Sequence, residues 1–329
     1  MSAECPYTPP PPPPPPPPAP PPPTPASSPK KKLYQTVGSS RGAVEGNLTE
    51  ACVLLAQRES RVRRMAETRN RRKKKPGALG KRNKHFFRKD LQWILVNTYV
   101  PSLIQDGPQC GLVALWMSTH LRKPPLCVDM ETVVRTALSR GYTAQGEMFS
   151  ADHMALLAEE VCGCKAELLS GGIRGDNAAA IITHLWGRQP VLIPYDEDYN
   201  HEPCRRSGHR AHWAVASGVL LGVDQGSVSE AHTRPEPTLP WLYAPVDNGA
   251  PCPAGDAALK EVYVLAKQGK SLRYQLWSLD SIAASNEQLR TMDPKRANDG
   301  TQYVVPLGGV EAGLAGRVVM LHTRTEKQK

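Results

Sequence analysis

The 329-residue sequence contains no run of about 18 apolar residues, the length that an α-helix needs to cross a bilayer. Its first residues, MSAECPYTPPPPP, have neither the positive segment nor the apolar segment of a secretory signal. GxGxxG and Walker motifs are also absent, so no nucleotide-binding loop is indicated. The eight cysteines are irregularly spaced, which argues against a disulfide framework. We therefore expect a cytoplasmic protein with reduced thiols and no membrane contact.

The net charge of +10 comes from one segment of the chain. Residues 58–89 hold fifteen Lys and Arg against two Glu, a local net charge of +13, which leaves −3 for all other residues. A basic face on the folded part is therefore not expected, and no nucleic-acid partner is predicted. Residues 30–89 are interpreted as a basic linker that is flexible or forms a single exposed helix, because EACVLLAQRESRVRRMAE is weakly helical in pattern.

Residues 1–29 are dominated by proline and favour polyproline II, a stiff, extended helix. Such a segment can act as a spacer, but it is also the preferred ligand of aromatic-lined grooves, including those of profilin-type domains. Ten consecutive prolines favour the binding role. These are Pro9, Pro10, Pro11, Pro12, Pro13, Pro14, Pro15, Pro16, Pro17 and Pro18.

Residues 90–329 have the composition of a single folded domain. Helical patterns come first, in CGLVALWMSTHL, DMETVVRTALSRG, SADHMALLAEEVCG and DNAAAIITHLWG. Short strand-like runs follow, in KAELL, PVLIPYD, HWAVASGVLLGV, EVYVLAKQ, RYQLWS, QYVVPL and GRVVMLH. Helices followed by strands predict an α+β domain rather than a doubly wound sheet.

Cys110 is the strongest candidate for a reactive group. It follows the turn Gly107-Pro108 and begins the predicted helix CGLVALW. The free amides and the dipole at a helix N-terminus stabilise a thiolate, so we expect a lowered thiol pKa there. Cys127 and Cys162, which lie among apolar residues, are interpreted as structural.

A cysteine nucleophile requires a base, usually a histidine distant in sequence. His212 begins the strand-like run HWAVASGV after a turn, where its ring can project from the edge of a sheet. The group that orients this ring is expected to be Asp or Asn at a strand end. Asp280, after RYQLWSL, is the first candidate and Asn286 the second.

The oxyanion of the tetrahedral intermediate requires hydrogen-bond donors. Gln105 and Gln109 both precede Cys110. Gln105 is preferred because the intervening turn can direct its amide back to the sulfur, whereas the side chain of an immediate neighbour tends to point away.

A different interpretation of the same region is a zinc site. The segment HEPCRRSGHRAH contains His201, Cys204, His209 and His212, which are few enough residues apart to close one tetrahedral site. The spacing matches none of the established paired motifs, and it leaves Cys110 unexplained.

The segments QDGPQCGLVALWM and HWAVASGV resemble the nucleophile and histidine regions of papain-like and C39-like cysteine peptidases. The longer segments VPSLIQDGPQCGLVALWM, RGYTAQGEMFS, VLIPYDEDYNHEPC, HWAVASGVLLG and KQGKS, together with the proline-rich start, resemble the actin maturation protease family. The resemblance covers most of residues 90–320. It implies a papain-like fold, in which N-terminal helices pack against a mainly antiparallel sheet, preceded by a disordered proline-rich and basic region.

The resemblance also implies a function. A cysteine aminopeptidase of this family removes the acetylated N-terminal Met or Cys from immature actin, with Cys110 as nucleophile, His212 as base and no metal or organic cofactor. Profilin, which binds actin and polyproline, is then the expected partner of the proline segment. Arg205, Arg206 and Arg210 precede His212 and are candidates to attract the acidic residues after the cleaved one. A non-catalytic profilin or actin adaptor remains the alternative from another class.

Overall fold

The computed structural model describes residues 50–60, 87–121, 126–229, 231–246, 250–255 and 257–322. The chain divides into two units, residues 1–33 and 34–329, and all described residues belong to the second. The proline segment and residues 61–86 of the basic segment lie outside the described residues, so the profilin interpretation stays a prediction. No described helix is long and apolar enough to span a membrane.

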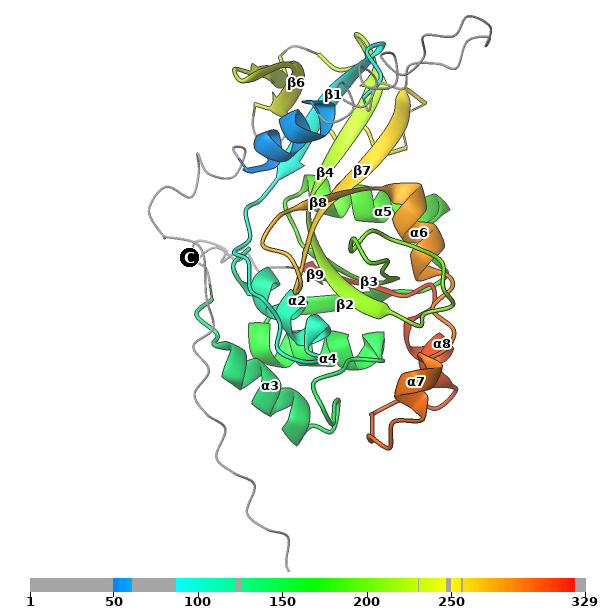
Figure 1. Cartoon of the computed structure of the whole chain (residues 1–329). Helices are drawn as coiled ribbons and strands as arrows, with labels where there is room; N and C mark the ends of the chain where they lie inside the picture. The colour runs from blue at the N-terminus through cyan, green and yellow to red at the C-terminus, as the bar shows by residue number, and fades with distance from the viewer. Residues whose placement is uncertain are drawn as a thin grey trace, which may run out of the picture. The chain divides into compact units, whose positions relative to one another are not determined.

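A mainly antiparallel sheet forms the centre of the second unit (Figure 1). Its strands are β1 (Leu91–Asn97), β2 (Lys165–Leu169), β3 (Val191–Asp196), β4 (Ala211–Asp224), β5 (Thr233–Glu236), β6 (Leu239–Pro245), β7 (Leu259–Gln268), β8 (Gln275–Ser278) and β9 (Val318–His322). The order is β2-β9-β3-β4-β1-β6-β5, and β7 pairs with β4 and β8. Among the strands of the described residues, only β1 and β6 pair in parallel.

The long strand β4 organises the sheet. One edge pairs with β7, whereas the other pairs first with β3 and then, from Gly218 onward, with β1. A register shift lies between Ala216 and Gly218. A Cβ at Gly218 would lie 2.5 Å from the carbonyl oxygen of Val96, so only glycine allows β1 to approach this point. The first part of β4, which carries His212, thus has its own partner strand.

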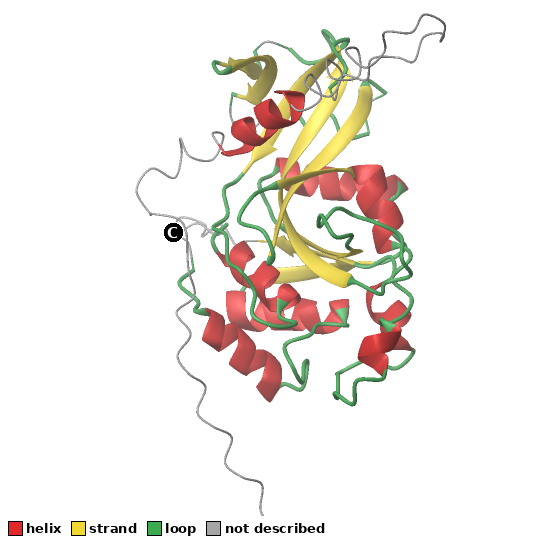
Figure 2. Cartoon of the chain, in the orientation of Figure 1, coloured by secondary structure: helices red, strands yellow, loops and turns green. Residues whose placement is uncertain are grey.

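The helices cover both faces of the sheet (Figure 2). They are α2 (Cys110–Thr119), α3 (Met130–Ser139), α4 (Ala151–Cys162), α5 (Gly175–Trp186), α6 (Leu279–Asn286), α7 (Pro294–Ala297) and α8 (Gly309–Leu314). One core joins α2, α3 and α4 to residues such as Trp213 and Val215 of β4. A second core joins α5 and α6 to Ala214 and Ala216, the alternate positions of the same strand.

The α+β class predicted from the sequence is confirmed, as are the helices at α2 to α5 and the strands at β2, β3, β4, β7, β8 and β9. Asp129 caps α3 and Ser150 caps α4, each accepting a hydrogen bond from a backbone N–H of the first turn. The strand predicted at QYVVPL is wrong, because residues 301–306 carry no regular structure. The backbone N–H of Val304 is bound instead by the carboxylate of Glu147, at 2.7 Å.

Residues 50–60, within the predicted linker, form a helix that packs on the domain. Ala51, Cys52 and Leu55 are buried in the first core. Glu50 is also held by the buried ammonium of Lys267 at 3.1 Å. This part of the predicted linker therefore belongs to the packed unit. Its apolar residues are buried in the first core, which the high positive charge of the surrounding segment did not indicate.

Candidate active site

Cys110 and His212 line the same cavity, whose volume is about 620 Å³. Cys110 is the first residue of α2, and His212 is the second residue of β4. The backbone of Trp213, the neighbour of His212, acts to lower the pKa of the Cys110 thiol, and a Cβ at the adjacent Gly111 would lie 3.1 Å from the ring of Trp213. The two residues paired on sequence grounds are thus brought together by the packing of α2 on β4.

Gly111 allows this close packing. A Cβ built at Gly111 would lie 2.8 Å from the Cβ of Met148 and 3.1 Å from Cδ1 of Trp213. Both distances are shorter than side chains tolerate, so any larger residue would push the start of α2 away from β4. The close packing of α2 on β4 therefore requires a glycine directly after Cys110.

The expected lowering of the Cys110 pKa is wrong. The thiol is 8% exposed, and burial raises its pKa, although hydrogen bonds from Trp213 and Gly111 and the charge of Lys270 oppose that rise. Removal from water disfavours the thiolate more than the helix N-terminus favours it. The resting site consequently holds a neutral thiol.

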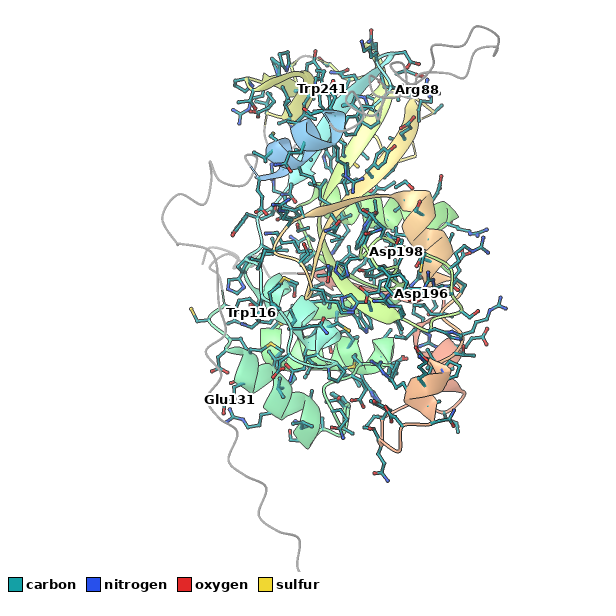
Figure 3. All side chains as sticks on the ribbon, in the orientation of Figure 1. Arg88, Trp116, Glu131, Asp196, Asp198 and Trp241 are labelled. Atoms are coloured by element: carbon teal, nitrogen blue, oxygen red, sulfur yellow. The ribbon has the colours of Figure 1, made fainter. Side chains whose placement is uncertain are left out.

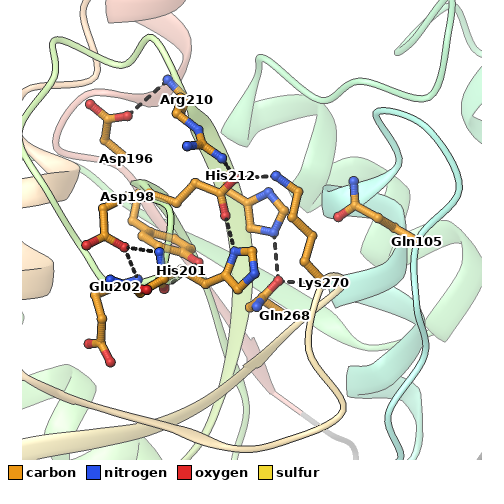
Figure 4. A network of polar contacts seen from close by, with 12 residues as sticks. Gln105, Asp196, Asp198, His201, Glu202, Arg210, His212, Gln268 and Lys270 are labelled. Atoms are coloured by element: carbon orange, nitrogen blue, oxygen red, sulfur yellow. Dashed lines mark hydrogen bonds and ion pairs between the residues drawn. The ribbon is translucent and has the colours of Figure 1, made fainter.

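His212 is held by Gln268, the last residue of β7. Oε1 of Gln268 lies 3.0 Å from Nε2 of His212 and also accepts a hydrogen bond of 2.6 Å from the backbone N–H of Lys270 (Figure 4). Because a backbone N–H can only donate, the atom facing it must be the amide oxygen. His212 then carries its proton on Nε2, which leaves Nδ1 bare to accept a proton.

Burial lowers the pKa of His212 to about 4. The carboxylate of Glu197 and the bond to Gln268 raise it, whereas the charge of Lys270 lowers it further. His212 is therefore a neutral imidazole near pH 7, the form required of a general base.

The structure does not bring Asp280 to His212. Ser278, at the end of β8, pairs with Tyr263, which pairs with Leu220, eight residues from His212 along β4. That offset corresponds to roughly 26 Å of strand. Asp280 is exposed in the first turn of α6.

Asn286, the second candidate for orienting the ring, makes its hydrogen bonds to groups other than His212. The side chain of Asn286 is buried, and its Nδ2 donates to the carbonyls of Pro194 and Arg317, which ties α6 to the sheet. Gln268 was missed because its position beside β4 depends on strand pairing; its sequence signal was the motif KQGK at a strand end.

Gln105 lines the cavity, as preferred on sequence grounds. Its backbone N–H donates to the carbonyl of Gly269 at 2.7 Å, and its Nε2 donates to the carbonyl of Gly107 at 2.7 Å. The structure gives the second N–H of this amide no hydrogen-bond partner among the described residues. Gln109 turns the other way: its side chain lies against Gly146 and does not line the cavity.

Glu197 adds a buried charge to the cavity wall. Its carboxylate, 1% exposed, binds Nδ1 of His201 at 3.0 Å, the guanidinium of Arg210 at 3.2 Å and the ammonium of Lys270. Burial raises the pKa of Glu197, but His212, Lys270 and His201 together hold it below the usual range. Glu197 is therefore an anion within reach of the Cys110–His212 pair, and the sequence reasoning did not identify it.

Asp196 shapes the loop that leads into His212. Its buried carboxylate accepts hydrogen bonds from the backbone N–H groups of Arg206, Gly208 and Arg210, at 2.7 to 3.0 Å. Figure 3 shows that Asp196 and Asp198 lie far from the end of the sheet near β6 and β1, where Trp241 and Arg88 are found.

Of the three arginines predicted to bind substrate, only Arg210 lines the cavity, and it is paired with Glu197. Arg206 stacks on the ring of Tyr199, and Arg205 is exposed outside the cavity lining. Further lining cations come from α7, where Lys295 and Arg296 face the cavity beside Asp293 and Asp299. The ring of Tyr303 lies under Arg296, at 5.5 Å.

The four residues of the zinc interpretation do not form a metal site. His201 binds Glu197, His212 binds Gln268, and no group of three or more potential ligands that could hold a metal ion occurs among the described residues. All four residues lie within the described part of the chain.

The chain matches a family model and curated proteins that carry the same name. Residues 100–220 match the family model "Actin maturation protease-like, C-terminal domain". The chain is 57% identical to the actin maturation protease of Danio rerio over 91% of its own length and 89% of that protein. It is 54% identical to the actin maturation protease of Homo sapiens over 73% of its own length and 69% of that protein. A solved C39-like peptidase from Bacillus anthracis covers 69% of this chain and 96% of its own, with a TM-score of 0.35 and 11% identity.

Proposed function

Because the chain belongs to the actin maturation protease family and is thus a peptidase, we propose that it is a cysteine aminopeptidase that removes the N-acetylated first residue, Met or Cys, from immature actin. The observation that carries the proposal is the meeting of Cys110 and His212 in one cavity, with His212 held in the tautomer of a base.

The first chemical step forms an acyl-enzyme. The Cys110 sulfur attacks the carbonyl carbon of the first residue while its proton passes to Nδ1 of His212. The oxyanion is stabilised by the remaining N–H of Gln105 and the backbone N–H of Cys110, which has no partner within α2 because it belongs to the first turn. The imidazolium then protonates the leaving amine, the C–N bond breaks, and a thioester remains.

The second step hydrolyses the thioester. His212, again neutral, takes a proton from water, and the hydroxide attacks the thioester carbonyl. The C–S bond breaks, the sulfur recovers the proton, and the acetylated amino acid leaves. Gln268 holds the ring through both steps, which places it in the role that the sequence reasoning gave to Asp280.

The charges of the cavity support a blocked, acidic peptide as substrate. Each lining carboxylate has a partner: Glu197 binds three cations, Asp293 caps α7, and Asp299 accepts from Tyr303. A free α-ammonium group therefore finds no uncommitted acid among these residues. Lys295 and Arg296, on the α7 wall, are available to the acidic side chains after the cleaved residue.

The remaining parts of the proposal concern the partner and location of the protein. The proline segment would bind profilin and so raise the local concentration of its actin cargo around the domain. A cytoplasmic location would keep Cys110 reduced.

Mass spectrometry of peptides tests the proposal. An N-acetylated actin N-terminal peptide is incubated with the wild type, Cys110→Ala and His212→Ala, beside the same peptide with a free amine and one with neutral residues after the first. The wild type should release one acetylated residue from the acidic blocked peptide, and the variants should remain folded and inactive. Cleavage by Cys110→Ala would refute the mechanism; no cleavage by the wild type would favour a non-catalytic adaptor.

A further inference from the structure

We propose that Glu197 and Lys270 form a positioning pair for proton transfer within the site: the ammonium stabilises the Cys110 thiolate, and the carboxylate stabilises the His212 imidazolium. The inference rests on the proposed function in taking Cys110 and His212 as the reacting groups. It concerns two residues that contribute no atoms to the reaction.

The first observation is the location of the pair. Glu197 follows β3 and Lys270 follows β7, the two strands that flank β4 on its opposite edges. Both residues line the cavity that contains Cys110 and His212, and they form a direct ion pair. The pair thus spans the start of β4, where His212 lies.

The second observation is the unequal effect of the two charges. At Cys110 the charge of Lys270, which lowers the thiol pKa, acts more strongly than that of Glu197, which raises it. At His212 the order reverses, since Glu197, which raises the imidazole pKa, acts more strongly than Lys270. The pair is therefore a fixed dipole whose field favours moving a proton from sulfur to imidazole.

The third observation is the need for such a field. Burial favours the neutral thiol and the neutral imidazole, so separating their charges is costly in this site. The other charged or titratable groups around His212 are His201 and Arg210, which bind Glu197, and Tyr195, whose ring packs edge-on at 5.8 Å. His201 and Arg210 hold the carboxylate in place, and only Lys270 among these cations is a main influence on Cys110.

Lys270→Met tests the cationic half of the pair. Its side chain is 35% exposed, and its backbone bond to Gln268 does not depend on the side chain, so the fold and the His212 contact should persist. We measure the rate of Cys110 alkylation by iodoacetamide between pH 5 and 10, with Cys110→Ala as the background for the other cysteines. Loss of the ammonium should raise the pKa of the thiol further and so lower the alkylation rate at pH 7, by about tenfold.

Two variants serve as controls. Lys270→Arg, which keeps the charge, should retain most of the wild-type rate. Lys260→Met removes another ion-paired lysine from β7, bound to Asp224 at 3.1 Å at the opposite end of the strand, and should leave the alkylation profile unchanged.

Glu197→Gln tests the anionic half with the blocked peptide. Removal of the carboxylate should lower kcat with little change in KM and move the acid limb of the pH profile to lower pH, because the pKa of His212 falls further. A merely structural role would not move that limb.

An unchanged alkylation profile in Lys270→Met, or an equal loss in Lys270→Arg, overturns the inference. An unmoved acid limb in folded Glu197→Gln overturns it as well. If the alkylation shift appears while the wild type cleaves no blocked peptide, the proposed function fails and the pair's effect on the thiol stands.

Discussion

Replacing Gln268 by leucine removes the side-chain contact that fixes the tautomer of His212. Leucine is similar in size but cannot accept the hydrogen bonds now made by Nε2 of His212 and the backbone N–H of Lys270. Without the acceptor, the imidazole can rotate or carry its proton on Nδ1. Either change removes the base that Cys110 requires.

The cost can be approximated from the two orphaned donors. A buried donor left unsatisfied costs about 1–3 kcal/mol, and His212 is only 2% exposed, so the two donors together should cost about 2–6 kcal/mol in the free energy of unfolding. A positioned general base contributes at least about 10²-fold to the rate, so kcat should fall on the order of 10²-fold. Gln268→Glu keeps an acceptor and should retain the fold, but its negative charge should move the acid limb of the pH profile to higher pH.

The assay combines urea unfolding with kcat on the blocked acidic peptide. Leu265→Ala is the matched control, because Leu265 is a fully buried residue of the same strand and its truncation costs about 2–5 kcal/mol without touching His212. Leu265→Ala should lose stability and retain kcat. A folded Gln268→Leu with wild-type kcat, or an equal loss of kcat in Leu265→Ala, would refute the reasoning.

Two further predictions concern packing and pH. Gly111→Ala should destabilise the protein by about 1–3 kcal/mol and reduce kcat, since the added Cβ meets Met148 and Trp213; unchanged thermal unfolding and kcat would contradict the close contact. His212 and His184 have pKa values of about 4 in the folded state, so the unfolded chain binds more protons once the pH falls below about 6.5. The free energy of unfolding, measured with urea, should therefore fall from pH 6.5 toward pH 4. The two histidines together can lower it by at most about 2.7 kcal/mol per pH unit. His184→Gln should remove about half of that slope, and equal stability at pH 6.5 and 4.5 would refute the assignment.

The parts of the site that were predictable from sequence are those with local signals. Asp129 and Ser150 mark helix starts through their side chains, and Cys110 stands out because a turn precedes it and an apolar helix follows. No local pattern marks Glu197, and the KQGK motif around Gln268 does not show which residue it will face, since each acquires its role only when β3 and β7 pair with β4. Asp280 met the rule of an acid after a strand, but β8 runs antiparallel to β7 and away from His212, so its last residue, Ser278, pairs with Tyr263 in the middle of β7.

A pKa is equally invisible to local sequence reasoning. The position of Cys110 at a helix start correctly indicated hydrogen-bond donors near the sulfur, yet the sign of the shift depends on how completely α2 is buried against β4. Residue type and helix position indicate only the contribution that lowers the pKa of the thiol. The burial that reverses it comes from the tertiary packing that Gly111 permits.

The short turn after β7 explains why the residue that orients His212 is a neutral amide. Gln268 binds the imidazole of His212, and Lys270 binds Glu197. Between them, Gly269 leaves room for Gln105, since a Cβ there would lie 2.7 Å from Oε1 of Gln105. Three parts of the site thus depend on three consecutive residues. A carboxylate at position 268 would place a second anion near Glu197 and raise the pKa of His212, which would leave less of the neutral base near pH 7. The amide fixes the same tautomer without adding a charge, and the field of the site is then set by the Glu197–Lys270 pair.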